Sequence, residues 1–320
     1  MKINNLILKY VWMPLIAGTF ASCQTDNVDD IEFGVSADKT TVTVGEAVRF
    51  WFDGNPDYIS FYPGTKTCNY ANRERTRIEG VDSVGMSCKI EQVYTELKAY
   101  KDQQLLTACV STDFTGVYTP ENIAAATWKA VEGLKMPVSA TANVTIEYTE
   151  ADLREYLDKD FYVAFQYKAG PNTIKESNYG KPRIQIKLLT LAKRDPDKYV
   201  YKDEDVAYGW GFQTVLVQTQ PKGEKYDITE SMLSFFPDKD TEKDKDVEVW
   251  MISKKLNAAT IEPDRGTPIK STNARLPYYE FRYDRPGTYK ATFIATNANM
   301  WNSKQAVREV TITVNETTAE

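Results

Sequence analysis

The chain has 320 residues, of which 39 are basic and 45 acidic, so its net charge at neutral pH is −6. An acidic body is a poor partner for nucleic acid and for anionic lipid headgroups, and we expect it to bind neither. Histidine is absent, which excludes Ser-His-Asp and Cys-His catalysis and the usual zinc and copper sites. These features predict a protein that is not an enzyme, although carboxylate chemistry stays open because Asp and Glu are plentiful.

The first two dozen residues have the features of a secretory signal that ends in a cysteine. Lys2 and Lys9 form a basic start, and the apolar stretch that follows is short and contains Pro14. Such a stretch does not span a membrane. Small residues precede Cys23, which is typical of a bacterial lipobox, where the signal is removed and the cysteine is lipidated. We expect a signal peptide over 1–22 and a mature protein held to a membrane by lipid alone. The alternative is a secreted protein with a free cysteine.

Alternating apolar residues at both ends of the chain predict strands. Segments 41–44 and 47–52 flank a tight turn and are expected to form a hairpin, with a further strand at 58–62. Strands at 288–296 and 307–314 are expected to form a second hairpin. Neither hairpin is stable alone in water, so we expect the two ends to combine in one module. The side chains expected to face its core are Val48, Phe50, Phe52, Tyr289, Ala291, Phe293, Ala295, Val310, Ile312 and Val314.

The middle of the chain is also rich in β-forming residues, and one short helix is expected there. Thr149 can cap this helix, and Leu153, Tyr156 and Leu157 share one apolar face. The charged run at 238–248 is expected to be a solvated loop or strand edge rather than a metal site. Many short strands separated by turns are typical of β-sandwiches. The strands expected here are 105–111, 144–148, 161–167, 183–189, 212–217 and 247–253.

Three cysteines remain after Cys23, and an odd number cannot all pair within one chain. Cys68 and Cys88 lie in the same short, turn-rich stretch and are the pair best placed to form a disulfide in an oxidising compartment. The alternative is that these two and Cys109 are buried free thiols, because a chain of this length does not need a disulfide to be stable.

Several segments resemble known families. Residues 42–50 and 54–62 resemble the opening of a Bacteroidota lipoprotein family, the domain-of-unknown-function family 5017. Residues 286–299 resemble the closing strands of a PKD-like (Ig-like) module, whereas 111–116, 126–128 and 161–167 resemble a jelly-roll of anchored surface proteins. The resemblance implies a member of a polysaccharide-utilisation system, in which surface lipoproteins hold glycans beside an outer-membrane transporter. The turn at 63–66 departs from the family pattern, so no role is carried over to it.

We therefore expect an all-β fold, with an Ig/PKD-like β-sandwich formed by both chain ends and an inserted jelly-roll-like β-sandwich. An acidic stretch after the lipid cysteine marks export to the cell surface in some Bacteroidota lipoproteins, and the polar, acidic tether here is similar. The expected location is thus the outer membrane, at the cell surface. The expected boundaries are 1–22 for the signal peptide, 23–32 for the tether, 33–64 with 247–315 for the outer domain, and 65–246 for the inserted domain.

Glycan binding places aromatic faces against sugar rings, while amides and carboxylates bond the hydroxyl groups. Tyr208 and Trp210 form one candidate cluster, because the flanking glycines let a backbone approach a ligand. Asn297, Asn299 and Trp301 form a second candidate cluster on an expected loop. For each tryptophan the alternative is packing in a sandwich core. Trp128 and Trp250 lie in or beside strand patterns and are expected to be core residues, and Trp51 is the next candidate for binding.

Jelly-rolls often hold a structural calcium ion, and Asp113 and Asp152 are candidate ligands for one. No dense spacing of acidic residues supports such a site, so we expect both to be hydrogen-bonded turn residues and predict no cofactor.

The sequence favours a non-catalytic lipoprotein that binds a polysaccharide or oligosaccharide. The first alternative is a structural or adhesive surface protein that contacts protein partners through exposed sheet edges. The second is a carboxylate-based glycoside hydrolase, which needs two carboxylates at a defined separation that sequence alone does not select.

Overall fold

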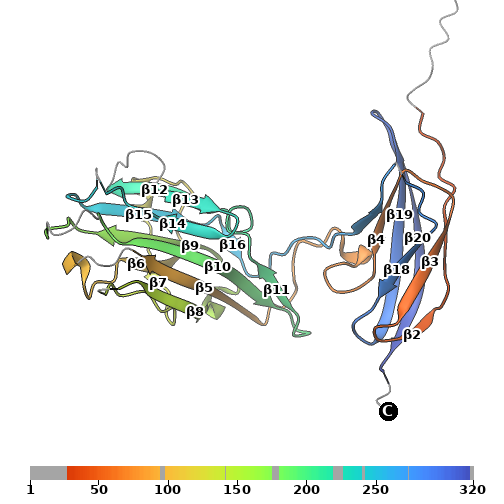
Figure 1. Cartoon of the computed structure of the whole chain (residues 1–320), viewed down its shortest axis with the longest axis horizontal. Helices are drawn as coiled ribbons and strands as arrows, with labels where there is room; N and C mark the ends of the chain where they lie inside the picture. The colour runs from red at the N-terminus through yellow and green to blue at the C-terminus, as the bar shows by residue number, and fades with distance from the viewer. Residues whose placement is uncertain are drawn as a thin grey trace, which may run out of the picture. The chain divides into compact units, whose positions relative to one another are not determined.

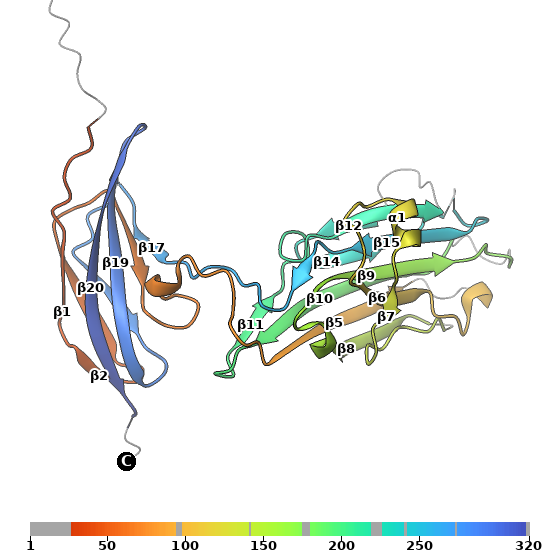
Figure 2. The same ribbon diagram turned by 180° about the vertical axis from the view of Figure 1, so that it is seen from behind.

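The computed structural model describes residues 27–93, 98–140, 142–174, 180–218, 226–239, 242–272 and 274–317. The regular secondary structure of this part of the chain is almost entirely β-strand (Figures 1 and 2), which confirms the predicted all-β class. The chain divides into two compact units. The outer unit combines Met1–Glu74 with Asp264–Glu320, and the inserted unit is Arg75–Pro263. The predicted signal peptide, Cys23 and the tether residues before Asn27 lie outside the described residues.

The outer unit is a β-sandwich with an aromatic core. Phe50 of one sheet packs on Phe293 of the other, with ring centroids 5.0 Å apart. All the side chains predicted to face this core belong to it. The smaller sheet has the strand order β1-β3-β18, and the larger has the order β17-β4-β19-β20-β2. The strands are β1 (Gly34–Ala37), β2 (Thr41–Thr43), β3 (Ala47–Asp53), β4 (Tyr58–Tyr62), β17 (Thr267–Lys270), β18 (Tyr278–Arg282), β19 (Gly287–Ala298) and β20 (Ser303–Asn315).

Of the two predicted hairpins, the C-terminal one is confirmed and the N-terminal one is wrong. β19 pairs with β20 along its whole length. β2 instead pairs in parallel with β20, whereas β3 pairs with β1 and β18 in the other sheet. The turn at Gly45, with φ of +80°, carries the chain from one sheet to the other. Val42 and Val48 therefore reach the core from opposite sheets.

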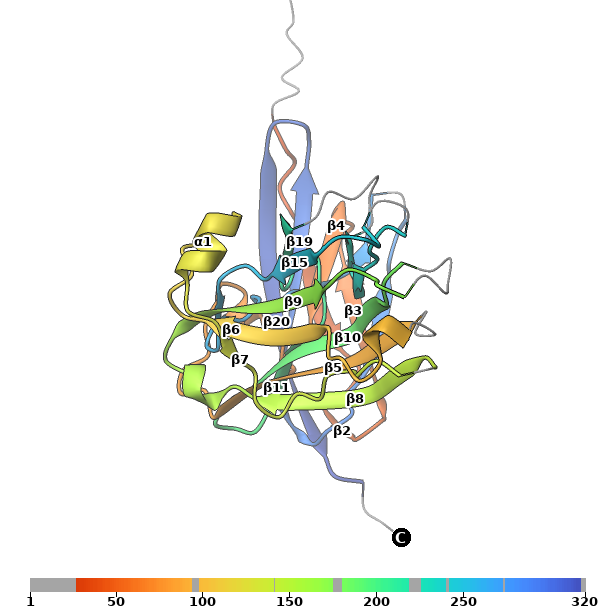
Figure 3. The same ribbon diagram turned by 90° about the vertical axis from the view of Figure 1, so that its left-hand side faces the viewer.

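The inserted unit is a second β-sandwich, and all the strands predicted in this part of the chain are present. One sheet has the order β13-β14-β10-β5-β8 with β11 beside β10, and the other has the order β12-β15-β9-β6-β7 with β16 beside β9. Figure 3 labels β10, β5 and β8 of the first sheet and β15, β9, β6 and β7 of the second. One apolar core takes side chains from both sheets. The strands are β5 (Ser83–Val93), β6 (Leu106–Ser111), β7 (Lys129–Ala130), β8 (Val144–Asp152), β9 (Asp160–Ala169), β10 (Arg183–Arg194), β11 (Val200–Asp203), β12 (Gln213–Gln218), β13 (Tyr226–Thr229), β14 (Met232–Phe235), β15 (Val247–Ile252) and β16 (Leu256–Asn257).

The predicted helix after Thr149 is wrong. β8 continues to Asp152 because it pairs with β5 as far as Gly85, and a single 3₁₀ turn, η3 (Arg154–Tyr156), follows. The α-helix of the described chain, α1 (Pro120–Ala125), begins after Thr119, whose hydroxyl accepts a bond from the Asn122 N–H. Two further 3₁₀ turns are η1 (Tyr70–Asn72) and η2 (Lys98–Tyr100).

The predicted boundary at residue 247 is also wrong. β15 begins there, but it pairs with β9 and β12 in the inserted unit. The outer unit resumes at Asp264. None of the described helices is long and apolar enough to cross a membrane.

Candidate functional site

The outer face of β5 carries small side chains along the first half of the strand. Alternation along β5 buries every second residue and turns Ser83, Gly85 and Ser87 outward. Ala192 of β10 lies opposite Gly85. The sheet face is hollowed over these small residues, and the hollow, here called the groove, has a volume of about 490 Å³. A side chain at Gly85 is crowded, because a Cβ there would lie 3.0 Å from the carbonyl oxygen of Ala151.

One wall of the groove comes from β8. The Tyr148 side chain is 62% exposed and donates its hydroxyl to Glu150 Oε2 at 2.5 Å. This hydrogen bond raises the pKa of Tyr148. Asp152 follows on the same strand, and its carboxylate accepts bonds from the backbone N–H of Arg154 at 2.9 Å and from its Nε at 2.7 Å. The wall therefore presents an aromatic ring, two carboxylates and a guanidinium.

The carboxylates at both sides of the groove are paired with cations. Lys198 donates to Asp82 at 2.8 Å, and this bond lowers the pKa of Asp82. Hydrogen bonds from Arg154 lower the pKa of Asp152. Such carboxylates stay ionised at neutral pH, so they accept hydrogen bonds from hydroxyl groups but do not deliver a proton as a general acid.

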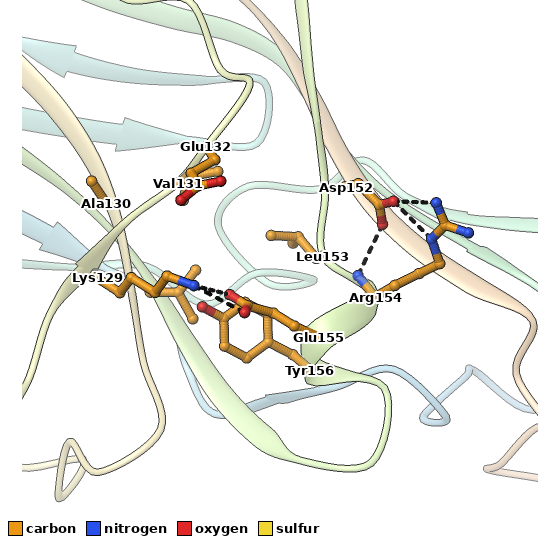
Figure 4. Close-up of a pocket in the computed structure, with 10 residues that line it drawn as sticks. Lys129, Ala130, Val131, Glu132, Asp152, Leu153, Arg154, Glu155 and Tyr156 are labelled. Carbon is orange, nitrogen blue, oxygen red and sulfur yellow. Dashed lines mark hydrogen bonds and ion pairs between the residues drawn. The ribbon is translucent and has the colours of Figure 1, made fainter.

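A smaller hollow of about 240 Å³ adjoins the groove at Asp152 and Arg154, which line both (Figure 4). On its other side, Lys129 Nζ donates to the two oxygens of Glu155 at 3.0 and 2.9 Å. Hydrogen bonds from Tyr156 and from Lys129 lower the pKa of Glu155. The groove and this hollow share Asp152 and Arg154, and the two together are here called the depression. Ion pairs hold the carboxylates of Asp82, Asp152 and Glu155 in place.

The prediction that Trp210 binds a ligand is wrong. Its side chain is 0% exposed, stacks on Phe212 with centroids 5.7 Å apart, and donates from Nε1 to the carbonyl oxygen of Asp203 at 3.2 Å. The flanking glycines allow a tight turn: Gly211 has a φ of +58°, and a Cβ at Gly209 would lie 2.7 Å from the carbonyl oxygen of Asp205. Tyr208 is 76% exposed, in contrast to the tryptophan, so the two do not form one aromatic surface.

The second predicted cluster lies at the tip of the β19–β20 hairpin. Trp301 is 65% exposed. The amide of Asn299 shapes the loop, because its Oδ1 accepts the backbone N–H groups of Trp301 and Asn302 at 2.9 and 2.8 Å. The Oδ1 of Asn297 accepts the backbone N–H of Asp57 at 2.9 Å. The tip thus displays the indole, while both amides make bonds within the unit.

Trp51 has an aromatic neighbour that sequence reasoning missed. It lies opposite Tyr278 in the smaller sheet of the outer unit, with ring centroids 5.2 Å apart, and the two side chains are 43% and 40% exposed. Arg49 lies 4.6 Å from the centroid of Tyr278 and bonds Glu280 through Nε at 2.9 Å. Alternation over 278–282 is the signal that places Tyr278 and Glu280 on this face. Trp128 and Trp250 pack together in a separate core cluster, as predicted.

The disulfide considered between Cys68 and Cys88 is not formed, and the described cysteines, with Cys109, are free thiols. Cys88 is buried in the core of the inserted unit, where desolvation raises its pKa to about 12. Cys68 belongs to the outer unit and donates from Sγ to the carbonyl oxygen of Arg265 at 2.9 Å.

The two aspartates considered as calcium ligands are engaged in hydrogen bonds. Asp113 Oδ1 accepts the hydroxyl of Ser111 at 2.8 Å and the backbone N–H of Thr127 at 2.9 Å, and Asp152 is paired with Arg154. Within the described ranges, no group of three or more Cys, Asp or Glu side chains is arranged to hold a metal ion.

Comparison with known proteins gives one informative match. No curated protein matches the chain. A solved structure, the Fcho1 Mu homology domain of Danio rerio with bound Eps15 peptide, aligns with the chain at 9% identity over 89% of each chain, with a TM-score of 0.14. The family described as "Domain of unknown function (DUF5017)" matches residues 22–208, a span that includes β5, β8 and β10 of the groove. Because this match covers more than half of the chain, the protein belongs to the DUF5017 family.

Proposed function

We propose that this protein is a surface lipoprotein that binds a polysaccharide or oligosaccharide in the groove of the inserted unit without cleaving it. The supporting observation is the floor of small side chains at Ser83, Gly85 and Ala192, which lets the apolar face of a sugar ring come close to the sheet. Tyr148 stands beside this floor and offers an exposed aromatic face. The volume of about 490 Å³ falls within the range of roughly 300–1,000 Å³ that is typical of small-molecule sites.

The polar groups of the groove suit a ligand rich in hydroxyls. Each sugar hydroxyl donates and accepts, and the wall supplies acceptors at Glu150 and Asp152 and a donor at Arg154. Hydrogen bonds to charged groups contribute about 1.5–3 kcal/mol each. Because the ion pair of Asp152 and Arg154 holds both side chains in place, less side-chain entropy is lost on binding.

The charge states support binding rather than hydrolysis. A glycoside hydrolase needs one carboxyl group whose pKa is raised so that it protonates the leaving oxygen. In the depression, the pKa of Asp82, Asp152 and Glu155 is lowered instead. These three carboxylates are therefore poorly suited to act as the general acid of a glycoside hydrolase.

A second candidate function is adhesion to a protein partner, and the exposed pair of Trp51 and Tyr278 favours it. The two rings lie on the outer face of a three-stranded sheet whose edge strands, β1 and β18, have 4 and 5 residues. Aromatic residues with a neighbouring arginine, here Arg49, are enriched at protein interfaces. Loss of protein capture without loss of glycan binding in Trp51→Ala would support this function.

The proposed location is the outer membrane, with the chain held at the cell surface by acyl groups on Cys23. In this proposal the partners are a glycan and an outer-membrane glycan transporter. The membrane is contacted through the lipid anchor.

Affinity electrophoresis through gels that contain single polysaccharides tests the proposal, with the chain lacking residues 1–23 as the sample. Ala192→Trp places an indole in the groove and is expected to weaken binding at least tenfold. Gln213→Trp adds the same group at an exposed position of the other sheet and is expected to bind like the wild type.

Tyr148→Ala is the second test variant, because it shortens an exposed side chain and leaves the sheet intact. Thermal melts confirm that each variant is folded. Equal retardation of the wild type and of both groove variants by every polysaccharide that binds would contradict the groove as the site, and release of reducing sugar would contradict the absence of cleavage.

A further inference from the structure

The loop that joins β19 to β20 presents two apolar side chains to solvent. Met300 and Trp301 are 84% and 65% exposed. The loop is held by its own bonds, because the backbone N–H of Asn299 donates to the carbonyl oxygen of Asn302 at 2.9 Å and the Asn299 side chain accepts two further backbone N–H groups. The tip therefore displays a thioether and an indole on a structured support.

The first described residues lie against this tip. Lys304 forms an ion pair with Asp30 at 2.6 Å, and the side chain of Asn297 donates to the carbonyl oxygen of Asp29 at 3.3 Å. The side chain of Asn299 reaches the carbonyl oxygen of Asn27 at 3.5 Å. Figures 1 and 3 show this segment beside the end of the β19–β20 hairpin. Both strands of the hairpin thus hold the segment that leads to Cys23.

The segment between Asn27, which contacts the tip, and the proposed lipidation site at Cys23 is short. Cys23 precedes Asn27 by four residues, and four residues span at most roughly 14 Å. A lipidated cysteine lies in the headgroup region, so a chain anchored there keeps the tip close to the membrane surface. Tryptophan is enriched in this region, where its ring is partly apolar and its N–H finds a partner.

We propose that Met300 and Trp301 enter the headgroup region of the membrane that carries the Cys23 lipid, and that they form a second membrane contact of the outer unit. This inference rests on the proposed lipid anchor. Two attachment points restrict rotation of the outer unit about its tether, which a single flexible lipid does not. The net charge of −6 disfavours binding to anionic headgroups, so the expected partner is a zwitterionic lipid surface. Trp301 is exposed enough to contact a soluble ligand. We assign it to lipid because the segment that leads to Cys23 lies beside its loop.

The test replaces the lipid by an artificial tether. The chain from residue 24, with an N-terminal hexahistidine tag, is bound to phosphatidylcholine vesicles that contain a nickel-chelating lipid and a lipid brominated near the headgroup. Bromine quenches tryptophan emission at short range. We expect emission to fall when the wild type binds, relative to vesicles without bromine, and to fall equally for Trp51→Phe, the other exposed tryptophan of the outer unit.

Trp301→Phe is expected to lose this quenching while it still floats with the vesicles. The proposal is overturned if the bound wild type is not quenched, or if Trp301→Phe is quenched as much as the wild type. Because the tag holds the chain, the result does not depend on acylation of Cys23, which acyl labelling in cells tests separately. The gel assay for glycan binding gives a third, independent readout.

Discussion

Replacement of Trp210 by alanine tests whether this residue is a core residue or a ligand contact. The side chain is fully buried, stacks on Phe212 and donates its N–H to the carbonyl oxygen of Asp203. Its removal leaves a cavity and takes away the hydrogen-bond partner of a backbone carbonyl. Truncation of a buried aromatic residue to alanine costs about 3–5 kcal/mol. We expect the free energy of unfolding of the inserted unit to fall by that amount.

Urea unfolding monitored by far-UV circular dichroism measures this loss, with Trp301→Ala as the matched control. Trp301 is 65% exposed, and surface substitutions usually change stability by less than about 0.5 kcal/mol. Because Trp210 belongs to the inserted unit, the transition of that unit should move to lower urea while the transition of the outer unit stays in place. The reasoning is refuted if Trp210→Ala unfolds at the same urea concentration as Trp301→Ala.

Three further predictions follow from the chain. Cys23→Ala is expected to abolish acyl labelling and to move the protein out of the membrane fraction, which fractionation checks. Deletion of 278–320 removes β18 and β19, which pair with β3 and β4, so limited proteolysis is expected to cut within 33–62 in the truncated chain and to leave this segment intact in the full chain. Burial lowers the pKa of Lys181 to about 8 from its ordinary value of 10.5. The unfolded chain therefore holds more protons between these values, and from pH 8 to 10.5 the unfolding free energy of the wild type should rise relative to Lys181→Met.

Strand positions were predictable because burial is encoded locally. In β19, the residues at every second position from Tyr289 to Ala295 face the core, and the alternation is visible without any knowledge of the partner strand. Which strands pair with one another was harder to predict from the sequence. The pattern of 41–44 and 47–52 fits a hairpin as well as it fits two strands in facing sheets, since each arrangement buries Val42 and Val48.

The helix expected after Thr149 is a different kind of error, in which a local sequence pattern suggested an element that the fold does not form. Leu153 and Tyr156 are buried, as the helical spacing requires, but a single 3₁₀ turn is enough to bury both. Pairing of Asp152 with Gly85 keeps the preceding residues extended. Tertiary pairing thus overrides a local pattern that covers only one turn.

The groove was not predictable, because its floor is made of residues that carry no chemical signal. Ser83, Gly85 and Ala192 are small, and they matter only because two strands distant in sequence bring them side by side. Tyr148 and Glu150 come from a third strand. No sequence motif joins these positions, so a site built from shape alone becomes visible only when the register of β5, β8 and β10 is known.

The two tryptophans singled out in the sequence show why composition near an aromatic residue does not decide its role. Glycines beside Trp210 suggested an approach path for a ligand, yet they allow a turn that carries the indole into the core. Amides beside Trp301 suggested hydrogen bonds to a ligand, yet they hold the loop and the N-terminal segment. In both places the neighbouring glycines or asparagines determine the backbone conformation of a turn and do not form a binding surface. Whether the indole is buried then depends on which side of the turn faces the core: Trp210 lies on the core side, and Trp301 lies on the solvent side.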